Sequence, residues 1–381
     1  MRLHISPSPA SDPWRASTRR AWLVSAAAAG AAPWLMDPAR ALAPRTLTFP
    51  RDHGSHPDLR TEWWYVTGQA QAAGQSWGFQ VTFFRSRVEA AQPLQSAFAA
   101  RQLVFAHAAL TDLRGGTLHH DQRIARAGFG IAQASEADTS IRLGAWALTR
   151  AQQGAGSRYA ATVQAEGFGL ELQFDTTQPV LLQGAQGLSR KGPDASQASY
   201  YYSQPQMTVS GHLQLAGRRM AVEAAGSSGL DNRAWLDHEF GDALVPPDAV
   251  GWDWIGMNLL DGSALTAFRL RHRNGSALWA GGSLRTAGGE TRAFGPQAVT
   301  FTPLRHWVSP ASQARYPVQW RIETPAGTFE VHALLDMQEL DSQASTGAIY
   351  WEGLSELRDG SGRTVGRGYL EMTGYAKPLR L

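Results

Sequence analysis

The 381-residue chain is 43% hydrophobic and only 18% charged, which suffices for one large domain or two and excludes intrinsic disorder. Residues 1–43 hold five of the 35 basic and two of the 32 acidic residues, so the rest of the chain carries 30 of each and no net charge. Without a basic patch we expect no nucleic-acid partner. Without cysteine, the fold needs no disulfide.

The N-terminal region has the three parts of an export signal. Arg19 and Arg20 precede an alanine-rich apolar run over 21–36, and Ala41-Leu42-Ala43 supplies a small-x-small cleavage pattern. The run is too short and broken for a membrane span, which needs about 20 apolar residues. We therefore predict a signal peptide over 1–43, export by the twin-arginine (Tat) machinery, and a periplasmic or secreted product with no integral membrane span after processing. An uncleaved anchor or a chance arginine pair is the alternative.

From about residue 47 onward, short apolar runs alternate with turns. "SWGFQVTFFRSR" (76–87) puts alternate residues on one face, as a half-buried strand does, and "RQLVFAHAALTDL" (101–113) behaves alike. Residues 263–284 read as two strands around Asn274-Gly275, a strong hairpin signal. Long amphipathic helices are not evident in the sequence. We predict an all-β fold, a barrel or a sandwich.

The two halves of the chain share a sequence pattern. "EWWYVTGQAQAAGQSWGFQVTFFR" (62–85) and "WDWIGMNLLDGSALTAFRL" (252–270) both begin with aromatics and end in a strand closing on Phe-Arg, and "YYYSQPQMTVSG" (200–211) echoes "GYLEMTGY" (368–375). Two copies about 190 residues apart in this sequence indicate duplicated domains. We expect one domain over 44–225 and a second over 226–381.

The first stretch with candidate functional residues is "PRDHGSHPDLRTEWWYVTG" (50–68). His53 and His56 invite metal ligation, but no further ligands follow at a recognised spacing, so a solvated loop is the favoured interpretation and no metal is predicted. Three aromatics in a row, from Trp63 to Tyr65, place rings on both faces of a strand. The outward ring, beside Glu62, is either an interface plug or a pocket wall.

"GQSWG" (74–78) matches the Gly-x-Ser-x-Gly pattern of serine hydrolases. That motif needs a strand-to-helix elbow, whereas Ser76 enters another strand. A hairpin is the favoured interpretation.

"RAWLDHEFGDA" (233–243) places three ionisable residues side by side, Asp237, His238 and Glu239. On a strand, His238 points to one face and the two acids to the other, together with Trp235, so the triplet is not a three-ligand metal cluster. Two interpretations remain. Either the carboxylates form structural salt bridges with arginines beside a hydrogen-bonded histidine, or a histidine–acid pair lies at the lip of an aromatic cavity.

"GWDWIG" (251–256) would complete such a cavity. Asp253 lies between two tryptophans and faces opposite to both rings. A carboxyl group in apolar surroundings has a raised pKa and can act as a general acid, which makes Asp253 a candidate.

Four ordered motifs, "EWWYVTG", "WLDHEFG", "GWDWIGMNLLDGSALTAFRLR" and "YWEGL…GRGYLEMTGY", resemble the lipocalin-like AttH and carotenoid 1,2-hydratase superfamily across about 45–381. The resemblance implies two tandem lipocalin-like antiparallel β-barrels with an apolar, isoprenoid or lipid-like, ligand and a hydratase or hydrolase type of reaction. It implies an aspartate, a histidine and tryptophans at the site. The sequence shows no phosphate-binding loop, dinucleotide fingerprint or zinc-ligand spacing, so we expect no cofactor. The candidate catalytic residues are Asp237, His238, Glu239 and Asp253, and the candidate ligand-binding residues are Glu62, Trp63, Trp64, Tyr65, Trp235, Trp252 and Trp254.

Three functions fit these observations. The first is an exported cofactor-free hydratase or hydrolase that acts on an apolar molecule. The second is a non-catalytic carrier of such a molecule, and the third is an accessory protein whose aromatics join the two barrels. Whether His238 and a carboxylate reach the same cavity separates the first from the second.

Overall fold

The computed structural model describes residues 42–224, 232–242 and 245–379. The predicted signal peptide lies outside the described residues apart from its last two positions. The segment around the predicted domain boundary, 225–231, lies outside them as well.

The described residues form 24 β-strands and two short 3-10 helices, Arg51–His53 and Glu89–Ala91. Sheet A contains β1 (Thr61–Ala72), β2 (Gln75–Arg87), β3 (Gln102–Asp112), β4 (Thr117–Arg126), β5 (Ala132–Ala134), β6 (Ser140–Leu143), β7 (Trp146–Gln153), β8 (Gly156–Gln164), β9 (Phe168–Asp175), β10 (Leu181–Leu182), β11 (Leu188–Arg190), β12 (Ala198–Leu215), β13 (Arg218–Ala221) and β14 (Arg233–Gly241). Sheet B contains β15 (Gly251–Leu259), β16 (Ala264–Arg271), β17 (Ala277–Arg285), β18 (Thr291–Phe294), β19 (Thr300–Val308), β20 (Arg315–Thr324), β21 (Gly327–Ala333), β22 (Glu339–Ser342), β23 (Ala348–Arg358) and β24 (Thr364–Thr373).

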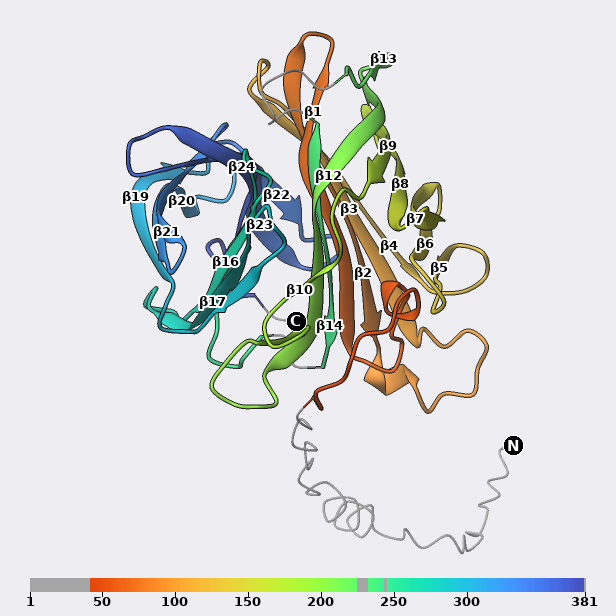
Figure 1. The fold of residues 1–381 in the computed structure, drawn as a ribbon. Helices are drawn as coiled ribbons and strands as arrows, with labels where there is room; N and C mark the ends of the chain where they lie inside the picture. Colours follow the sequence, from red (N-terminus) through yellow and green to blue (C-terminus); the bar gives the residue numbers. More distant parts are fainter. Residues whose placement is uncertain (1–41, 225–231, 243–244, 380–381) are drawn as a thin grey trace, which may run out of the picture. The chain divides into compact units, whose positions relative to one another are not determined.

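Both sheets are antiparallel, and the all-β prediction is confirmed. Sheet A runs in the order β4-β3-β2-β1-β14-β12-β9-β8-β7-β6-β5 and curls until β3 and β4 approach β5 and β6, which makes a nearly closed barrel (Figure 1). Sheet B runs β18-β17-β16-β15-β24-β23-β21-β20-β19. Among the described residues, no helix is long and apolar enough to cross a membrane.

The two sheets close in the same way. In sheet A the last strand, β14, pairs with the first, β1, and in sheet B the last strand, β24, pairs with the first, β15. The echo between 62–85 and 252–270 therefore matches equivalent hairpins, β1–β2 and β15–β16. The echo between 200–211 and 368–375 does not, because β12 is the neighbour of the closing strand β14, whereas β24 is itself the closing strand.

The chain leaves sheet A later than the boundary at 225/226 predicts. β14 lies beyond that boundary, yet it pairs in sheet A between β1 and β12. The change of sheet falls between Gly241 and Gly251. The division of the chain into two folding domains stays a prediction.

Short-range signals place the hairpins well. Asn274-Gly275 turns the chain from β16 into β17, with the Gly275 amide donating to the His272 carbonyl and a φ of 84° that glycine adopts without strain. The "GQSWG" stretch is the β1–β2 hairpin, in which Ala72 pairs with Gln75. Ser76 is therefore a strand residue, as predicted.

Candidate functional site: an acidic aromatic cavity between the sheets

The two sheets enclose a cavity of about 130 Å³. Its walls come from β1, β2, β3, β12 and β14 of sheet A and from β15, β16, β23 and β24 of sheet B. The size is comparable with the engineered cavity of roughly 150 Å³ that accepts benzene. It therefore suits the end of an apolar molecule rather than the whole of a long one.

The register of sheet A builds one wall in two rows across three strands. Tyr65, Asp237 and Ser203 are directly paired on β1, β14 and β12. In the next row on the same face, Trp63, Glu239 and Tyr201 are paired. Because residues two apart on a strand share a face, the pairing register of these three strands places both rows on the cavity side.

Sheet B builds the opposite wall in the same manner. Trp254 pairs with Glu371, and Glu371 pairs with Glu352, across β15, β24 and β23. Thr373 lies one row along on the same face, pairs with Tyr350, and accepts a hydrogen bond from the Trp252 amide at 2.9 Å. The cavity thus has aromatic side chains on both walls and carboxyl groups between them.

Asp237 is a buried carboxyl with three hydrogen-bond donors, and no cation of the described residues forms an ion pair with it. It accepts hydrogen bonds from Tyr201 at 2.7 Å, from Ser203 at 2.5 Å and from the Trp235 indole at 2.7 Å. Burial raises the pKa of Asp237 to about 7, against the opposing effect of these hydrogen bonds and with a contribution from Glu239. A protonated carboxyl at near-neutral pH is what a general acid requires.

Glu352 and Glu371 form a second acidic group, opposite each other on β23 and β24. Burial raises the pKa of Glu352 well above its usual range, and the neighbouring Glu371 raises it further. Burial also raises the pKa of Glu371 to about 7, opposed by a hydrogen bond from Trp252 and supported by the charges of Asp237 and Glu239. Because each carboxylate disfavours ionisation of its neighbour, the two groups titrate as a pair.

The Tyr65 hydroxyl and the Glu352 carboxyl are neighbours in the cavity, and their interaction adds to the raised pKa of Tyr65 and opposes the rise in the pKa of Glu352. Within the described residues, neither the Tyr65 hydroxyl nor Oε1 of Glu352 makes a hydrogen bond of good geometry, although the two residues are only 6% and 2% exposed. Buried polar atoms that are not fully satisfied are rare and costly. A hydroxyl group or a water molecule between the two oxygens would satisfy both.

The remaining ionisable groups that line the cavity have polar partners. Lys191 lies 2.7 Å from Glu239, and its ammonium stands over the rings of Tyr201 and Phe268. His107 contacts the Tyr350 hydroxyl at 2.8 Å, and burial lowers its pKa to about 3, so its imidazole is neutral. Among the described residues that line the cavity, Lys191 carries the one positive charge.

Six of the predicted site residues meet at this cavity: Trp63, Tyr65, Asp237, Glu239, Trp252 and Trp254. A seventh, Trp235, orients Asp237 through its indole N–H. The Trp63 and Tyr65 rings line the cavity and also pack in the apolar core between the sheets. They therefore form both a pocket wall and an interface contact.

His238 does not reach the cavity. It lies on the other face of β14, inside sheet A, where Trp64 stacks on it at 4.6 Å and its Nε2 lies 3.0 Å from Glu62. The role expected for His238 beside a cavity carboxylate, and the ligand-binding roles expected for Glu62 and Trp64, are therefore not retained. The alternation that delivers Asp237 to the cavity turns His238 away from it.

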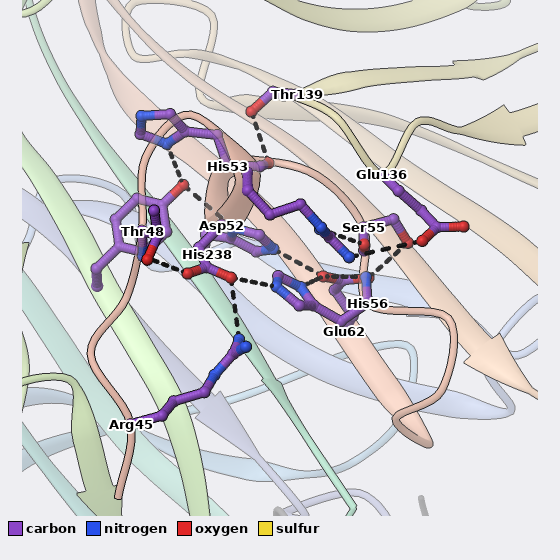
Figure 2. Close-up of polar contacts among 12 residues, drawn as sticks. Arg45, Thr48, Asp52, His53, Ser55, His56, Glu62, Glu136, Thr139 and His238 are labelled. Atoms are coloured by element: carbon purple, nitrogen blue, oxygen red, sulfur yellow. Dashed lines mark hydrogen bonds and ion pairs between the residues drawn. The ribbon is translucent and has the colours of Figure 1, made fainter.

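The residues of the "HGSH" stretch are buried, and their interpretation as a solvated loop is wrong. Figure 2 shows His56 held between two carboxylates, with its ring nitrogens 2.9 Å from Asp52 and 2.7 Å from Glu62. His53 contacts the Tyr202 hydroxyl at 2.8 Å. Sequence spacing could not predict this burial, because Glu62, His238 and Tyr202 come together only through the pairing of β1, β14 and β12.

Three side chains of this cluster, His56, Glu62 and His238, lie close enough together to share a cation. The charges, however, already balance, since Arg45 lies 3.0 Å from Asp52 and Arg85 lies 3.0 Å from Glu62. An added divalent ion would leave buried positive charge without compensation. We therefore assign the cluster to fold stability.

Asp253 does not line the cavity. It is fully buried on the face of β15 opposite the cavity, 2.7 Å from Arg269 and 3.0 Å from Arg271, and it accepts a hydrogen bond from Tyr375. Because the carboxyl is engaged by two guanidinium groups on the far face, the catalytic role expected for Asp253 does not fit its surroundings. Its orientation away from Trp252 and Trp254 agrees with the strand alternation.

Residues that the sequence analysis missed complete the cavity. Glu352 and Glu371 lie inside the closing motif "YWEGL…GRGYLEMTGY", and Tyr201 lies inside "YYYSQPQMTVSG", but none was singled out. The sequence does place these residues beside aromatics with the period-two pattern of strands. That pattern alone does not predict which face of which strand packs against Asp237.

Comparisons with known proteins agree with this architecture. Residues 40–375 match the AttH-like family. A solved AttH-type protein from Nitrosomonas europaea is 45% identical, with a TM-score of 0.80 over 88% of this chain and 99% of that one. Kievitone hydratase from Nectria haematococca is 14% identical, with a TM-score of 0.65 over 87% of this chain and 94% of that one, and so shares the fold. No curated protein matches the sequence.

The family match covers the whole described chain except its last few residues, and it includes both walls of the cavity. The resemblance read from the four motifs is thereby confirmed. The chain belongs to the AttH-like family and shares its fold with kievitone hydratase.

Proposed function

We propose that the chain is a cofactor-free hydratase that adds water to a carbon–carbon double bond at the end of an apolar, isoprenoid or lipid-like, molecule. One observation carries the proposal. Asp237, Glu352 and Glu371 have raised pKa values and meet in one aromatic cavity without a cation of their own. Such groups are suited to donate and accept protons near neutral pH.

The proposed reaction balances without a further reactant. The carboxyl of Asp237 gives its proton to one alkene carbon, forming a C–H bond and leaving positive charge on the other carbon. The π faces of Trp63, Trp252 and Trp254 stabilise that charge by about 0.5–2 kcal/mol each. A water oxygen then bonds to the cationic carbon, and its proton passes to the Glu352–Glu371 pair.

Tyr65 and Glu352 hold the oxygen in this scheme. The neighbouring Tyr65 hydroxyl and Glu352 Oε1 would bind the attacking water between them, and afterwards the product hydroxyl. The Tyr65 phenol stays protonated, because burial raises its pKa well above the usual range, and so it can donate to that oxygen. Export through the Tat machinery and a periplasmic or secreted location remain part of the proposal.

A non-catalytic carrier of an apolar molecule is the second candidate. The position of His238 favours it, since this imidazole does not share the cavity with a carboxylate and so cannot position water there. The two candidates separate on whether the bound molecule is changed.

The test incubates the protein with geraniol, farnesol and squalene in H2¹⁸O and follows masses by liquid chromatography and mass spectrometry. The hydratase predicts a product heavier by one labelled water, lost in Asp237→Asn and kept in the control Asp248→Asn, which alters an exposed acid. Binding of an unchanged molecule, equal in both variants, would establish the carrier instead. Product formation by Asp237→Asn at the parent rate would refute the assigned acid.

A further inference from the structure

Four large apolar side chains stand out of two neighbouring loops of sheet A. In the β2–β3 loop Leu94 is 51% and Phe98 is 74% exposed, and in the β4–β5 loop Phe129 is 59% and Ile131 is 52% exposed. The rings of Phe98 and Phe129 stack at 5.5 Å with planes 8° apart, which joins the two loops. We call these four residues the Phe98–Phe129 patch.

The patch is held in place at an energetic cost. Phe129 has a φ of 57°, a left-handed conformation that bulky residues rarely adopt, and it lies between two glycines that also have positive φ. Such backbone strain is costly and is concentrated at functional sites. Here it presents an aromatic ring to solvent instead of burying it.

Two arginines frame the patch without an acidic partner among the described residues. The Arg126 guanidinium stands over the Phe129 ring at 4.3 Å and the Phe98 ring at 5.9 Å, and it donates to the Ala97 carbonyl. Arg101 donates to the Leu94 carbonyl. The neighbouring Arg87 and Arg123 differ, because each faces a carboxylate.

We propose that the Phe98–Phe129 patch docks the protein on an anionic phospholipid surface. Exposed phenylalanines beside arginines match the interfacial layer of a membrane, where rings enter the acyl boundary and guanidinium groups bind lipid phosphates. The β2–β3 loop that carries half of the patch joins two strands that line the cavity, through Phe84 and His107. This docking is peripheral and adds no membrane-spanning segment.

A protein partner with an apolar groove is the competing occupant. The two arginines beside the patch favour an anionic lipid surface over such a groove. A lipid surface offers a phosphate for each unpaired guanidinium together with an apolar layer of the right depth for two rings. Attraction to an anionic surface falls with added salt, within a Debye length of about 8 Å at physiological ionic strength.

The chain contains no cysteine, so one introduced thiol reports on one position. We would label Gln95→Cys, in the exposed β2–β3 loop, with an environment-sensitive fluorophore, and label Glu290→Cys, in an exposed turn of sheet B, as the control. Vesicles of mixed phosphatidylcholine and phosphatidylglycerol should shift the emission of the first label to the blue and leave the second unchanged. This readout is independent of any membrane affinity of the N-terminal residues.

Paired variants then assign the effect to the patch. Phe98→Ser/Phe129→Ser should abolish the shift of the Gln95→Cys label and weaken vesicle binding about tenfold or more. The matched control is Leu304→Ser/Val308→Ser, whose parent side chains are 38% and 51% exposed on β19, and it should bind like the parent. The proposal is overturned if the Gln95→Cys label does not shift on anionic vesicles, or if it shifts equally in the phenylalanine variant.

Discussion

At the scale of single residues, the surroundings of Asp237 decide its chemistry. Three neutral donors orient its carboxyl, but no cation compensates its charge, so burial outweighs the hydrogen bonds and its pKa rises to about 7. Asp253, on β15 in the other sheet, instead lies against two arginines. The same residue type thus serves chemistry in one place and stability in another.

The first prediction concerns the pH dependence of stability. The folded pKa of Asp237, about 7, lies above the model-peptide value of 3.8, so the folded state binds this proton more tightly than the unfolded state does. Its contribution is complete at acid pH and is lost as pH rises through about 7. The wild type should therefore lose about 2–3 kcal/mol relative to Asp237→Asn between pH 5 and pH 8.

Urea unfolding of both proteins across this range measures the difference. Asp248→Asn, at an exposed acid, should run parallel to the wild type. A wild type that instead gains stability relative to Asp237→Asn as pH rises would mean that Asp237 is ionised in the fold.

The second prediction concerns the buried cluster of Figure 2. Glu62 accepts hydrogen bonds from Ser55, His56 and His238 (Figure 2). It also accepts a hydrogen bond from Arg85. Burial raises its pKa, but the hydrogen bonds from His238 and His56 outweigh burial and hold the pKa far below the usual range. Glu62→Gln leaves the buried Arg85 without a counter-ion and should cost roughly 3–5 kcal/mol in the free energy of unfolding.

The control for Glu62→Gln is Glu330→Gln, which removes a carboxylate from the partly exposed pair with His332 and should change stability by less than about 1 kcal/mol. Equal, small effects of both changes would show that the cluster is not needed for stability. Because the pKa of Glu62 is lowered, its contribution is present above the unfolded pKa and is lost as pH falls, which is the opposite sign to that of Asp237.

At the scale of elements, β1 divides its aromatic residues between two environments. Trp64 is 1% exposed and packs in the core of sheet A, whereas Trp63 and Tyr65 face the cavity. Trp64→Ala should cost roughly 3–5 kcal/mol of stability. Trp63→Ala should cost less stability and weaken geraniol binding more, as followed by tryptophan fluorescence. The reverse order of effects would place the two faces of β1 the other way round.

What the sequence could predict follows from the same alternation. Period-two patterning separates Asp237 and Glu239 from His238 and assigns Trp63 and Tyr65 to one face, because these facts are local to one strand. It could not place β14 between β1 and β12, since Trp64 and His238 are paired across 174 residues of chain. It could not bring Glu352 and Glu371 to Asp237 either, because that meeting depends on how two separate sheets pack.

At the scale of the whole molecule, the sheets share an apolar core and polar contacts. Tyr65, Trp254 and Tyr369 pack between them, Gln206 donates to the Leu259 carbonyl at 2.9 Å, and the Asn258 amide donates to the Ala234 carbonyl at 3.2 Å. We expect them to unfold together, with calorimetric and van't Hoff enthalpies equal in scanning calorimetry. Two resolved transitions would contradict this cooperativity.

The central claim is that the cavity keeps carboxylic acids protonated at neutral pH. An infrared titration of the folded protein in D2O tests it directly, because a protonated carboxyl has a C=O stretch distinct from that of a carboxylate. At pH 7 we expect this band to be present, to weaken in Asp237→Asn and in Glu352→Gln, and to remain unchanged in Asp248→Asn. The absence of the band at pH 7, or a band that no cavity substitution alters, would contradict the account.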